Sequence, residues 1–256
     1  MDEHRIENLF IQVKKIVTQI SSENLKSSKI DLVKEKNKLD FVTNLDISME
    51  NSLKSRLIKL LPGSKFFGEE ENQIHTLDGF TWVVDPIDGT QNFINDIPFF
   101  CSSVALYENI KPLFSIVCSP STNNTFSSIF GFGSFLNDKK LMPKKDRSFL
   151  CSISTCMLDE RFSNFLGILK SKFKIRIFGC QAMSLCYTAG GYFDLNINPD
   201  AMFWDDAAAI LILKEAGGDY FSKQSDDLIK KVDSISLSRN LDEEFKESIL
   251  SEWRKI

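Results

Sequence analysis

Two carboxylates three residues apart are the clearest sign of chemistry in this sequence. Asp85 and Asp88 lie on either side of Ile87 in the stretch FTWVVDPIDGTQNF, residues 80–93. A turn that brings both side chains into one small volume, with the Ile87 carbonyl between them, would gather three hard oxygen ligands. Oxygen ligands of this kind suit Mg²⁺, or Mn²⁺ as a substitute. The stretch therefore predicts a divalent metal site.

The residues around this pair predict how the backbone positions it. The β-branched and aromatic run 81–84 predicts a buried strand. Pro86 fixes φ and Gly89 permits conformations that other residues avoid, so a sharp turn should follow the strand. We expect a helix to begin over 89–93, with unpaired N–H groups that could hold phosphate beside the metal. The alternative is an ordinary turn with an aspartate cap, because these residue types dominate turns.

Other acidic residues could join the site. Glu69 and Glu70 follow a short strand-like run, although paired acids at a strand end are usually a solvated loop. Asp205 or Asp206 could be a plain N-cap of the apolar helix predicted over 207–213. A carboxylate at the start of so apolar a helix would otherwise face inward at a cost, unless a cation or a donor meets it. One of the two is therefore a further ligand candidate.

Composition and charge restrict the class of protein. The chain has 256 residues and 43% hydrophobic content, which suffices for one large domain or two small ones that share a cleft. A net charge of −4 gives no global basic field, so nucleic acid is an unlikely partner. No apolar run approaches the length of a membrane span, and the N-terminus MDEHRIENLF lacks a signal-peptide pattern. We therefore expect a cytoplasmic protein without a membrane partner.

Cysteine and histidine usage excludes further chemistries. The six cysteines form no CxxC pair, which argues against a zinc site and against a disulfide framework. We therefore expect free, mostly buried thiols. His4 falls in a predicted surface helix and His75 in a polar loop, which leaves little basis for a Ser-His-Asp or Cys-His mechanism.

Hydrophobic periodicity predicts alternating helices and strands along the chain. The predicted helices cover 3–25, 46–61, 89–93, 159–171, a segment that ends at 190–191, 207–213 and 241–255. The predicted strands cover 65–67, 81–84, 99–107, 111–118, 125–130, 150–155, 174–178 and 192–197. The alternation in the second half suggests a second α/β layer. A basic run over 139–147 predicts a solvated loop, with a partner or phosphate contact as the alternative.

Several motifs together resemble the inositol monophosphatase family, which belongs to a group of Mg²⁺-dependent, lithium-sensitive phosphatases. They are DFVTNLD (40–46), GEE (68–70), WVVDPIDGTQNF (82–93), GFGSFLND (131–138) and WDDAAAILILKEAGG (204–218), in the family order. The resemblance implies a sugar-phosphatase fold of alternating α/β/α/β/α layers and a homodimer. It also implies a single catalytic domain over 1–256, whose part to about 140 carries most metal ligands and whose remainder carries Asp205.

The resemblance implies a role for each candidate residue. The metal ligands would be Glu69, Asp85, the Ile87 carbonyl, Asp88 and Asp205. Glu70 would support this cluster, and Thr90 with Glu69 would position and deprotonate the attacking water. Asp46 would hydrogen-bond Thr90 or bind a further weak metal, whereas from the residues alone it reads as a helix cap. Lys36, or alternatively Lys38, would touch metal-bound waters or phosphate, although a solvated lysine is the simpler interpretation.

The substrate pocket is where this sequence departs from the family pattern. Backbone N–H groups of Gly89 and Thr90 would hold the phosphate, and the pocket would also include Asp88 and Asp205. Asn198 stands where the family often places an acid that binds inositol hydroxyls, so charge-assisted hydrogen bonds of about 1.5–3 kcal/mol each are lost. The segment Gly179-Cys180-Gln181 replaces the usual Gly-Ser/Thr-Ala, which changes the pocket wall.

The implied function is hydrolysis of inositol monophosphate, or a similar polyol phosphate, by a metal-activated water. A 3′-phosphoadenosine 5′-phosphate nucleotidase, a fructose-1,6-bisphosphatase or an NADP phosphatase is the alternative within the class. An alternative of another class is a regulatory or binding protein with vestigial catalysis that uses the basic run 139–147. A phosphotransferase would need a nucleotide cradle, and the sequence has no Walker-type loop.

Overall fold

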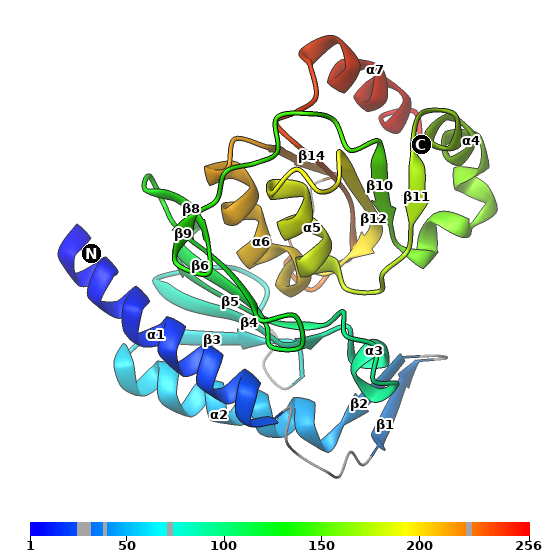
Figure 1. Cartoon of the computed structure of the whole chain (residues 1–256). Helices are drawn as coiled ribbons and strands as arrows, with labels where there is room; N and C mark the ends of the chain where they lie inside the picture. The colour runs from blue at the N-terminus through cyan, green and yellow to red at the C-terminus, as the bar shows by residue number, and fades with distance from the viewer. Residues whose placement is uncertain (25–31, 38–39, 71–73, 224–226) are drawn as a thin grey trace.

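Five layers of helices and sheets stack in the predicted order, α/β/α/β/α (Figure 1). The computed structural model describes residues 1–24, 32–37, 40–70, 74–223 and 227–256, without the side chains from 24 to 41. The first layer is α1 (Glu3–Asn24) with α2 (Asn44–Leu60). A ribbon of β1 (Leu32–Asn37) and β2 (Asp40–Thr43) leads into α2. Within the described ranges, no helix is long and apolar enough to cross a membrane.

A seven-stranded sheet is the second layer. Its strands, in spatial order, are β3 (Lys65–Gly68), β4 (Phe80–Asp88), β5 (Cys101–Glu108), β6 (Lys111–Ser119), β7 (Asn124–Ile129), β8 (Gly133–Leu136) and β9 (Lys139–Lys140). Only the β3–β4 pair of this sheet is parallel, with Gly68 opposite Val84. Because parallel strands end at the same edge, the chain leaves β3 at Glu69 next to Asp85. The short helix α3 (Thr90–Ile94) follows β4.

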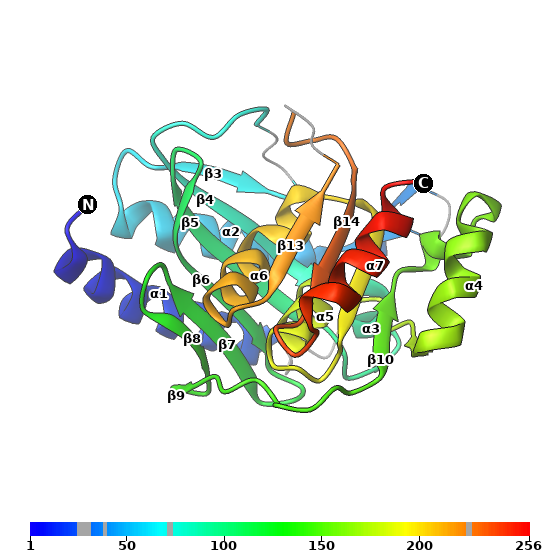
Figure 2. The ribbon, with the colours of Figure 1, turned by 90° about the horizontal axis from the view of Figure 1, so that it is seen from above.

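The third to fifth layers contain the second half of the chain. The third is α5 (Gln181–Ala189) with α6 (Phe203–Glu215), and the fifth is α4 (Ser163–Lys172) with α7 (Glu243–Trp253). Between them lies a sheet in the order β11 (Lys174–Arg176), β10 (Leu150–Ile153), β12 (Leu195–Ala201), β14 (Val232–Leu237) and β13 (Asp219–Ser222). Seen from the α7 side, this sheet overlies α5 and α6 (Figure 2).

Three buried apolar clusters hold the layers together. The first packs α1 and α2 against one face of the large sheet around Trp82, and the second packs α5 and α6 against its other face around Phe67. The third packs α4 and α7 against the outer face of the second sheet around Ile197. Alternating side chains along each strand allow one sheet to serve two clusters.

The inner face of the second sheet is polar instead of apolar. Paired positions on β10, β12 and β14 present buried Ser152, Asn196, Asn198, Ser234 and Ser236. Ser152 Oγ lies 3.2 Å from Ser184 Oγ on α5, so this face is turned towards the third layer. A polar face between buried layers indicates a ligand-binding site or a hydrogen-bonded network, because unpaired polar groups are costly to bury.

Several predicted boundaries are wrong, among them the start of the helix predicted over 207–213, which is α6 at Phe203–Glu215. Strand β4 continues to Asp88 instead of ending at 84, because a register shift between Asp85 and Asp88 accommodates Pro86 in the strand. The strand predicted at 192–197 is β12 at 195–201. Helix α4 begins at Ser163, not at 159. Pattern reading locates elements better than their ends.

Arg147 corrects the prediction that the basic run is a solvated loop. Its Nε lies 3.2 Å from Asp194 Oδ2, and Asp194 is fully buried. Its guanidinium also lies 4.0 Å from the centre of the Phe245 ring. Arg147 therefore ties the connection before β10 to α7, and its role is structural.

Candidate active site

The candidate site lies where β3 and β4 end. The Glu69 N–H donates to the Val84 carbonyl at 3.2 Å, which fixes Glu69 beside the Asp85 side of β4. Asp85 is only 1% exposed, and its Oδ1 has no hydrogen-bond partner among the described residues. A buried carboxylate oxygen without a donor is costly unless a cation meets it. Asp85 therefore fits a metal ligand and does not fit a turn cap.

The acidic side chains at this site act on one another. Burial raises the pKa of Asp85 well above its ordinary value, and the charges of Glu69, Asp88 and Asp205 raise it further. Burial is also the main cause that raises the pKa of Asp205, followed by the charges of Asp88 and Glu69. Repulsion grows as charges approach one another, which agrees with the position of Glu69 beside Asp85 at the ends of β3 and β4. A divalent cation among these carboxyls would remove the repulsion, so the donor set fits Mg²⁺.

Asp88 links the two halves of the site. Its Oδ1 accepts the Gln181 N–H at 3.1 Å, and its Oδ2 accepts the Ala182 N–H at 2.6 Å. The Cys180 thiol donates to Oδ2 at 3.1 Å. Burial raises the pKa of Asp88 to about 6, although these three hydrogen bonds act in the opposite direction. Asp88 thus joins β4 to the first turn of α5.

Thr90 and Asp46 form a second pair at the site. Thr90 Oγ1 lies 3.2 Å from Asp46 Oδ1 and 2.9 Å from the Ile87 carbonyl oxygen. Asp46 Oδ2 also accepts the Thr43 N–H at 2.8 Å, so Asp46 closes a capping box at the start of α2. The N-cap itself is Thr43, so the prediction that Asp46 caps the helix is wrong: Asp46 is the third residue of α2, completes the capping box and is also the partner of Thr90.

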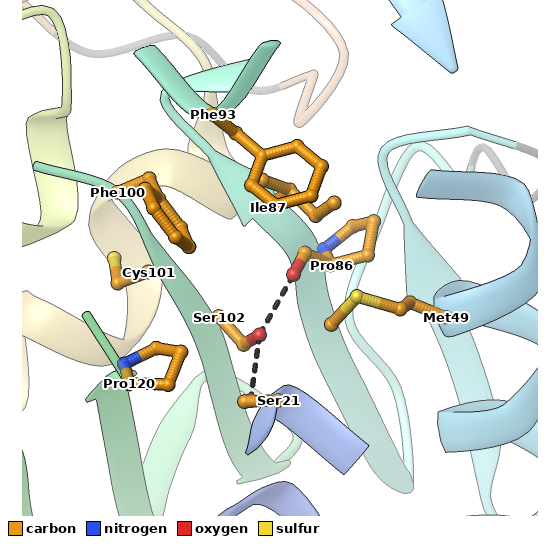
Figure 3. A pocket seen from close by; sticks show the side chains of 9 residues that line it. All are labelled: Ser21, Met49, Pro86, Ile87, Phe93, Phe100, Cys101, Ser102 and Pro120. Atoms are coloured by element: carbon orange, nitrogen blue, oxygen red, sulfur yellow. Dashed lines mark hydrogen bonds between the residues drawn. The ribbon is translucent and has the colours of Figure 1, made fainter. Parts of the chain in front are cut away.

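The turn after β4 is held tightly. Gly89 has φ of 90°, and a Cβ there would come within 3.1 Å of the Gly179 and Phe99 carbonyl oxygens, so glycine is required. Ser102 Oγ donates to the Pro86 carbonyl at 2.8 Å and lies 2.9 Å from Ser21 Oγ (Figure 3). These contacts fix the backbone that carries Asp85 and the carbonyl of Ile87.

Glu50, which was not among the predicted site residues, supports Glu69 and Glu70. The Glu70 N–H donates to Glu50 Oε2 at 2.8 Å, and Glu50 is 1% exposed. A side chain at Gly68 would overlap the Glu50 carboxylate, which explains the glycine before the two acids. The available signal was the position of Glu50 on α2, where its neighbours Met49 and Leu53 belong to the apolar face.

Of the two aspartates on α6, Asp205 joins the acidic cluster. Its Oδ2 accepts the Met202 N–H at 3.2 Å, as a helix-start residue would. Asp206 points elsewhere, because it accepts hydrogen bonds from Gln181 Nε2 at 2.8 Å and from the Tyr220 hydroxyl at 2.5 Å. The structure therefore favours Asp205 as the ligand candidate.

A cavity of about 160 Å³ opens beside Asp88. Its wall includes the predicted pocket residues Gly179, Cys180 and Asn198. Gln181, the third residue of the predicted wall segment, also lines it, and the polar lining residues that were not predicted are Ser152, Ser154, Thr155, Ser184 and Asn196. The alternation in LNIN (195–198) and LCSI (150–153) was the signal for a polar inner face. The side chain of Lys36, and the whole of Lys38, lie outside the described residues.

The layers and the acidic residues beside a polar cavity define a layered α/β protein with a candidate metal site. The chain belongs to the inositol monophosphatase family, whose model matches residues 2–255. This membership confirms the resemblance drawn from the motifs.

Individual relatives agree with this assignment. A fructose-1,6-bisphosphatase/inositol-1-monophosphatase of Aquifex aeolicus is 31% identical over 229 residues, which cover 84% of this chain and 87% of that protein. The extragenic suppressor protein suhB of Bartonella henselae has a TM-score of 0.80 at 25% identity, with 95% of this chain and 98% of that chain covered. An IMPase/NADP phosphatase solved with Mg²⁺ and phosphate shares the fold, with a TM-score of 0.81, 21% identity and coverage of 97% and 94%.

Proposed function

We propose that this protein is a Mg²⁺-dependent phosphomonoesterase that hydrolyses inositol monophosphate or a similar polyol phosphate. The observation that carries the proposal is the buried Asp85 carboxylate oxygen without a donor, among three other acidic side chains. Family membership supports the reaction class, and the related phosphatase solved with Mg²⁺ and phosphate supports the choice of metal.

The proposed metal ligands come from three segments of the chain. They are Glu69, Asp85, the Ile87 carbonyl, Asp88 and Asp205. When bound, Mg²⁺ would activate water and neutralise charge on the phosphate. Glu70 and Glu50 keep Glu69 in place through the hydrogen bond between the Glu70 N–H and Glu50.

Thr90 and Asp46 handle the proton of the attacking water in this proposal. The Thr90 hydroxyl accepts a hydrogen bond from the water while it donates a hydrogen bond to Asp46 Oδ1, which lies 3.2 Å away. Glu69 then receives the water proton. The N–H groups of Gly89 and Thr90, at the start of α3, hold the phosphate oxygens, as N–H groups that lack intrahelical partners can.

The alcohol part of the substrate occupies the cavity lined by Gly179, Cys180 and Asn198. Its walls offer hydroxyl, amide and backbone groups, which suit a polyol more than an apolar ester. Lys36 is proposed to contact the phosphate from β1. Fructose 1,6-bisphosphate is the second candidate substrate, because the Aquifex relative carries both activities in its name.

Phosphate release from a panel of substrates tests the proposal. The panel holds inositol 1-phosphate, fructose 1,6-bisphosphate, 3′-phosphoadenosine 5′-phosphate, NADP and glycerol 2-phosphate, each with Mg²⁺, with EDTA, and with lithium added. We expect Mg²⁺-dependent, lithium-sensitive release, fastest from inositol 1-phosphate. If no substrate releases phosphate while Mg²⁺ binds, the protein is a binding protein and the proposal is wrong.

Three further properties belong to the same proposal. The chain forms one catalytic domain, it assembles as a homodimer, and it works in the cytoplasm. Sedimentation of the purified protein tests the dimer, which should sediment at twice the mass of the 29.2 kDa chain.

A further inference from the structure

Two thiols meet at Asp88, one from each half of the molecule. Cys101, the first residue of β5, and Cys180, just before α5, have their Sγ atoms 3.7 Å apart. Asp88 Oδ2 lies 3.1 Å from Cys180 Sγ and 3.9 Å from Cys101 Sγ. All three side chains are buried. These residues are far apart along the chain, so sequence spacing gives no sign of the pair.

The three atoms have the spacing of a tetrahedral metal site. Zn–S bonds are about 2.3 Å long and Zn–O bonds about 2.0 Å. A tetrahedral zinc ion therefore holds two sulfur ligands about 3.8 Å apart. It holds a sulfur and an oxygen ligand about 3.5 Å apart. The observed sulfur separation is 3.7 Å, and the two sulfur–oxygen distances, 3.1 and 3.9 Å, lie on either side of the ideal. Side-chain shifts of a few tenths of an ångström would complete the geometry.

The cluster is also reachable from a cavity. Asp88 and Cys180 line the cavity of about 160 Å³. Cys101 lies on the far side of the cluster, where it lines a cavity of about 10 Å³ together with Ile87 and Phe100 (Figure 3). An ion can therefore approach through the large cavity, and the fourth coordination position would face that cavity.

We propose that Cys101, Cys180 and Asp88 form a site for a soft divalent cation such as Zn²⁺, which shares Asp88 with the proposed Mg²⁺ ligand set of Glu69, Asp85, Asp88 and Asp205. Sulfur ligands select soft ions, whereas the acidic cluster selects hard ones. A metal ion deprotonates the thiols that it coordinates, and their two protons pass to solvent without oxidation of sulfur. At Asp88 Oδ2 the ion takes the place of the Cys180 S–H, while the Ala182 N–H bond remains.

Occupation of this site should inhibit the enzyme. Asp88 would belong to both metal sites, so a soft ion and Mg²⁺ compete for it. This consequence rests on the proposed function, whereas binding of the soft ion does not.

Cobalt spectroscopy tests binding without any need for turnover. The reduced, metal-free protein is titrated with Co²⁺ in the absence of Mg²⁺, because the two ions would compete for Asp88, and thiolate-to-cobalt charge-transfer absorption is recorded. We expect one such Co²⁺ per chain in the wild type. Substitution of a supporting residue lowers metal affinity by about 10–100-fold, so Cys101→Ala, which removes a ligand, should lower it by at least about tenfold.

A matched control separates this cluster from the other buried thiols. Cys151 is equally buried, and its Sγ contacts only the Ser152 carbonyl among the described hydrogen bonds, so Cys151→Ala should bind Co²⁺ as the wild type does. Cys101→Ser serves as a second variant if Cys101→Ala unfolds, as judged by circular dichroism. Absence of the absorption in the wild type, or unchanged affinity in both Cys101 variants, overturns the proposal.

Zinc inhibition provides the second measurement. At fixed Mg²⁺, the Zn²⁺ concentration for half-inhibition should rise at least about tenfold in Cys101→Ala, relative to the activity of that variant without zinc. Equal inhibition of wild type and variant would contradict the shared role of Asp88. If the protein hydrolyses none of the phosphate esters, the proposed function fails, and the cobalt titration still decides on the metal site.

Discussion

At the scale of single residues, the buried Oδ1 atom of Asp85, which lacks a hydrogen-bond donor among the described residues, is the main sign of a metal site. Asp85 is buried without a donor for Oδ1, whereas Asp88 and Asp46 have several donors each. Side chains that destabilise a protein without its ligand are found at ligand-binding sites, where the bound ligand offsets their cost. Asp85 should therefore affect stability and metal binding in opposite directions.

Asp85→Asn tests this opposition. Without metal, the variant should unfold at a higher temperature than the wild type, because it removes a buried charge that repels Glu69 and Asp205. A gain of about 1 kcal/mol corresponds to about 2–4 °C in a protein of this size. Thermal unfolding in EDTA measures the effect, and a lower melting temperature for the variant would contradict it.

Asn198→Glu tests the alcohol pocket. Asn198 lines the cavity and is 8% exposed, so a carboxylate there would meet substrate hydroxyls with charge-assisted hydrogen bonds. The gain of about 1 kcal/mol over a neutral bond predicts about fivefold higher selectivity for inositol 1-phosphate over glycerol 2-phosphate. The ratio of the two kcat/KM values is the measurement, and unchanged selectivity would remove Asn198 from the pocket.

The sequence predicted the acidic residues of the site better than their supports. Motif spacing pointed to Glu69, Asp85 and Asp88, and the structure brings them together. The Cys101–Cys180 contact was not predictable, because it depends on how separate elements pack, and the one signal for Glu50 was its position beside apolar-face residues of α2. Local spacing carries no information about such pairs.

At the scale of elements, the parallel pairing of β3 with β4 positions the acidic residues. The Gly68–Val84 register sets Glu69 beside Asp85, and the buried Glu50 of α2 fixes the chain as it leaves β3. The polar inner face of β10, β12 and β14 then supplies the wall of the substrate cavity.

Gly68→Ala tests the connection between α2 and β3. The added methyl group overlaps the Glu50 carboxylate, so Glu50 must move and the Glu70 N–H loses its acceptor. We expect a loss of about 1–3 kcal/mol in unfolding free energy and a lower kcat. Denaturant unfolding and turnover measure the two effects.

Gly167→Ala is the matched control for Gly68→Ala. Gly167 lies in α4, and a Cβ there meets no atom within 4 Å. This variant should gain about 0.5–1 kcal/mol and keep wild-type turnover. Similar losses in both variants would show that the Glu50 contact has no special role.

Element types were predicted better than element ends. The helices over 3–25 and 241–255 match α1 and α7 within two residues. The end of β4 was missed because a shift in pairing with β5, which local sequence does not report, lets the strand continue past Pro86. Tyr192 and Phe193 looked like strand residues, but they pack on the ring of Tyr187 at 5.2 and 5.6 Å.

At the scale of the whole molecule, the site lies between the two halves of the chain. Glu69, Asp85 and Asp88 come from the large sheet, while Asp205 comes from α6 and the donors to Asp88 come from α5. Bringing these carboxyls together opposes folding unless protons or cations neutralise them. Stability should therefore depend on both pH and Mg²⁺.

The pH dependence has a definite sign. Burial raises the pKa of Asp88 to about 6 and raises those of Asp85 and Asp205 as well. Well below about pH 4 these groups are protonated in both the folded and the unfolded chain. As pH rises towards about 6 and above, the unfolded chain releases protons that the folded protein still holds, so the metal-free protein loses stability.

Mg²⁺ binds the charged carboxylates and should offset this loss. The rise in melting temperature on adding Mg²⁺ should therefore be larger at pH 8 than at pH 5.5. Thermal unfolding with Mg²⁺ or EDTA at both pH values measures it. An equal or larger rise at pH 5.5 would contradict the assignment of these carboxyls to the metal site.

The most direct test of the central claim is Mg²⁺-dependent phosphate release from inositol 1-phosphate by the wild type and Asp85→Asn, measured side by side. We predict release by the wild type only when Mg²⁺ is present, and a rate at least about 100-fold lower in the variant, which corresponds to about 2.7 kcal/mol of transition-state stabilisation. Release in EDTA, or wild-type turnover by Asp85→Asn, would contradict the claim that the buried carboxylate cluster holds the catalytic metal.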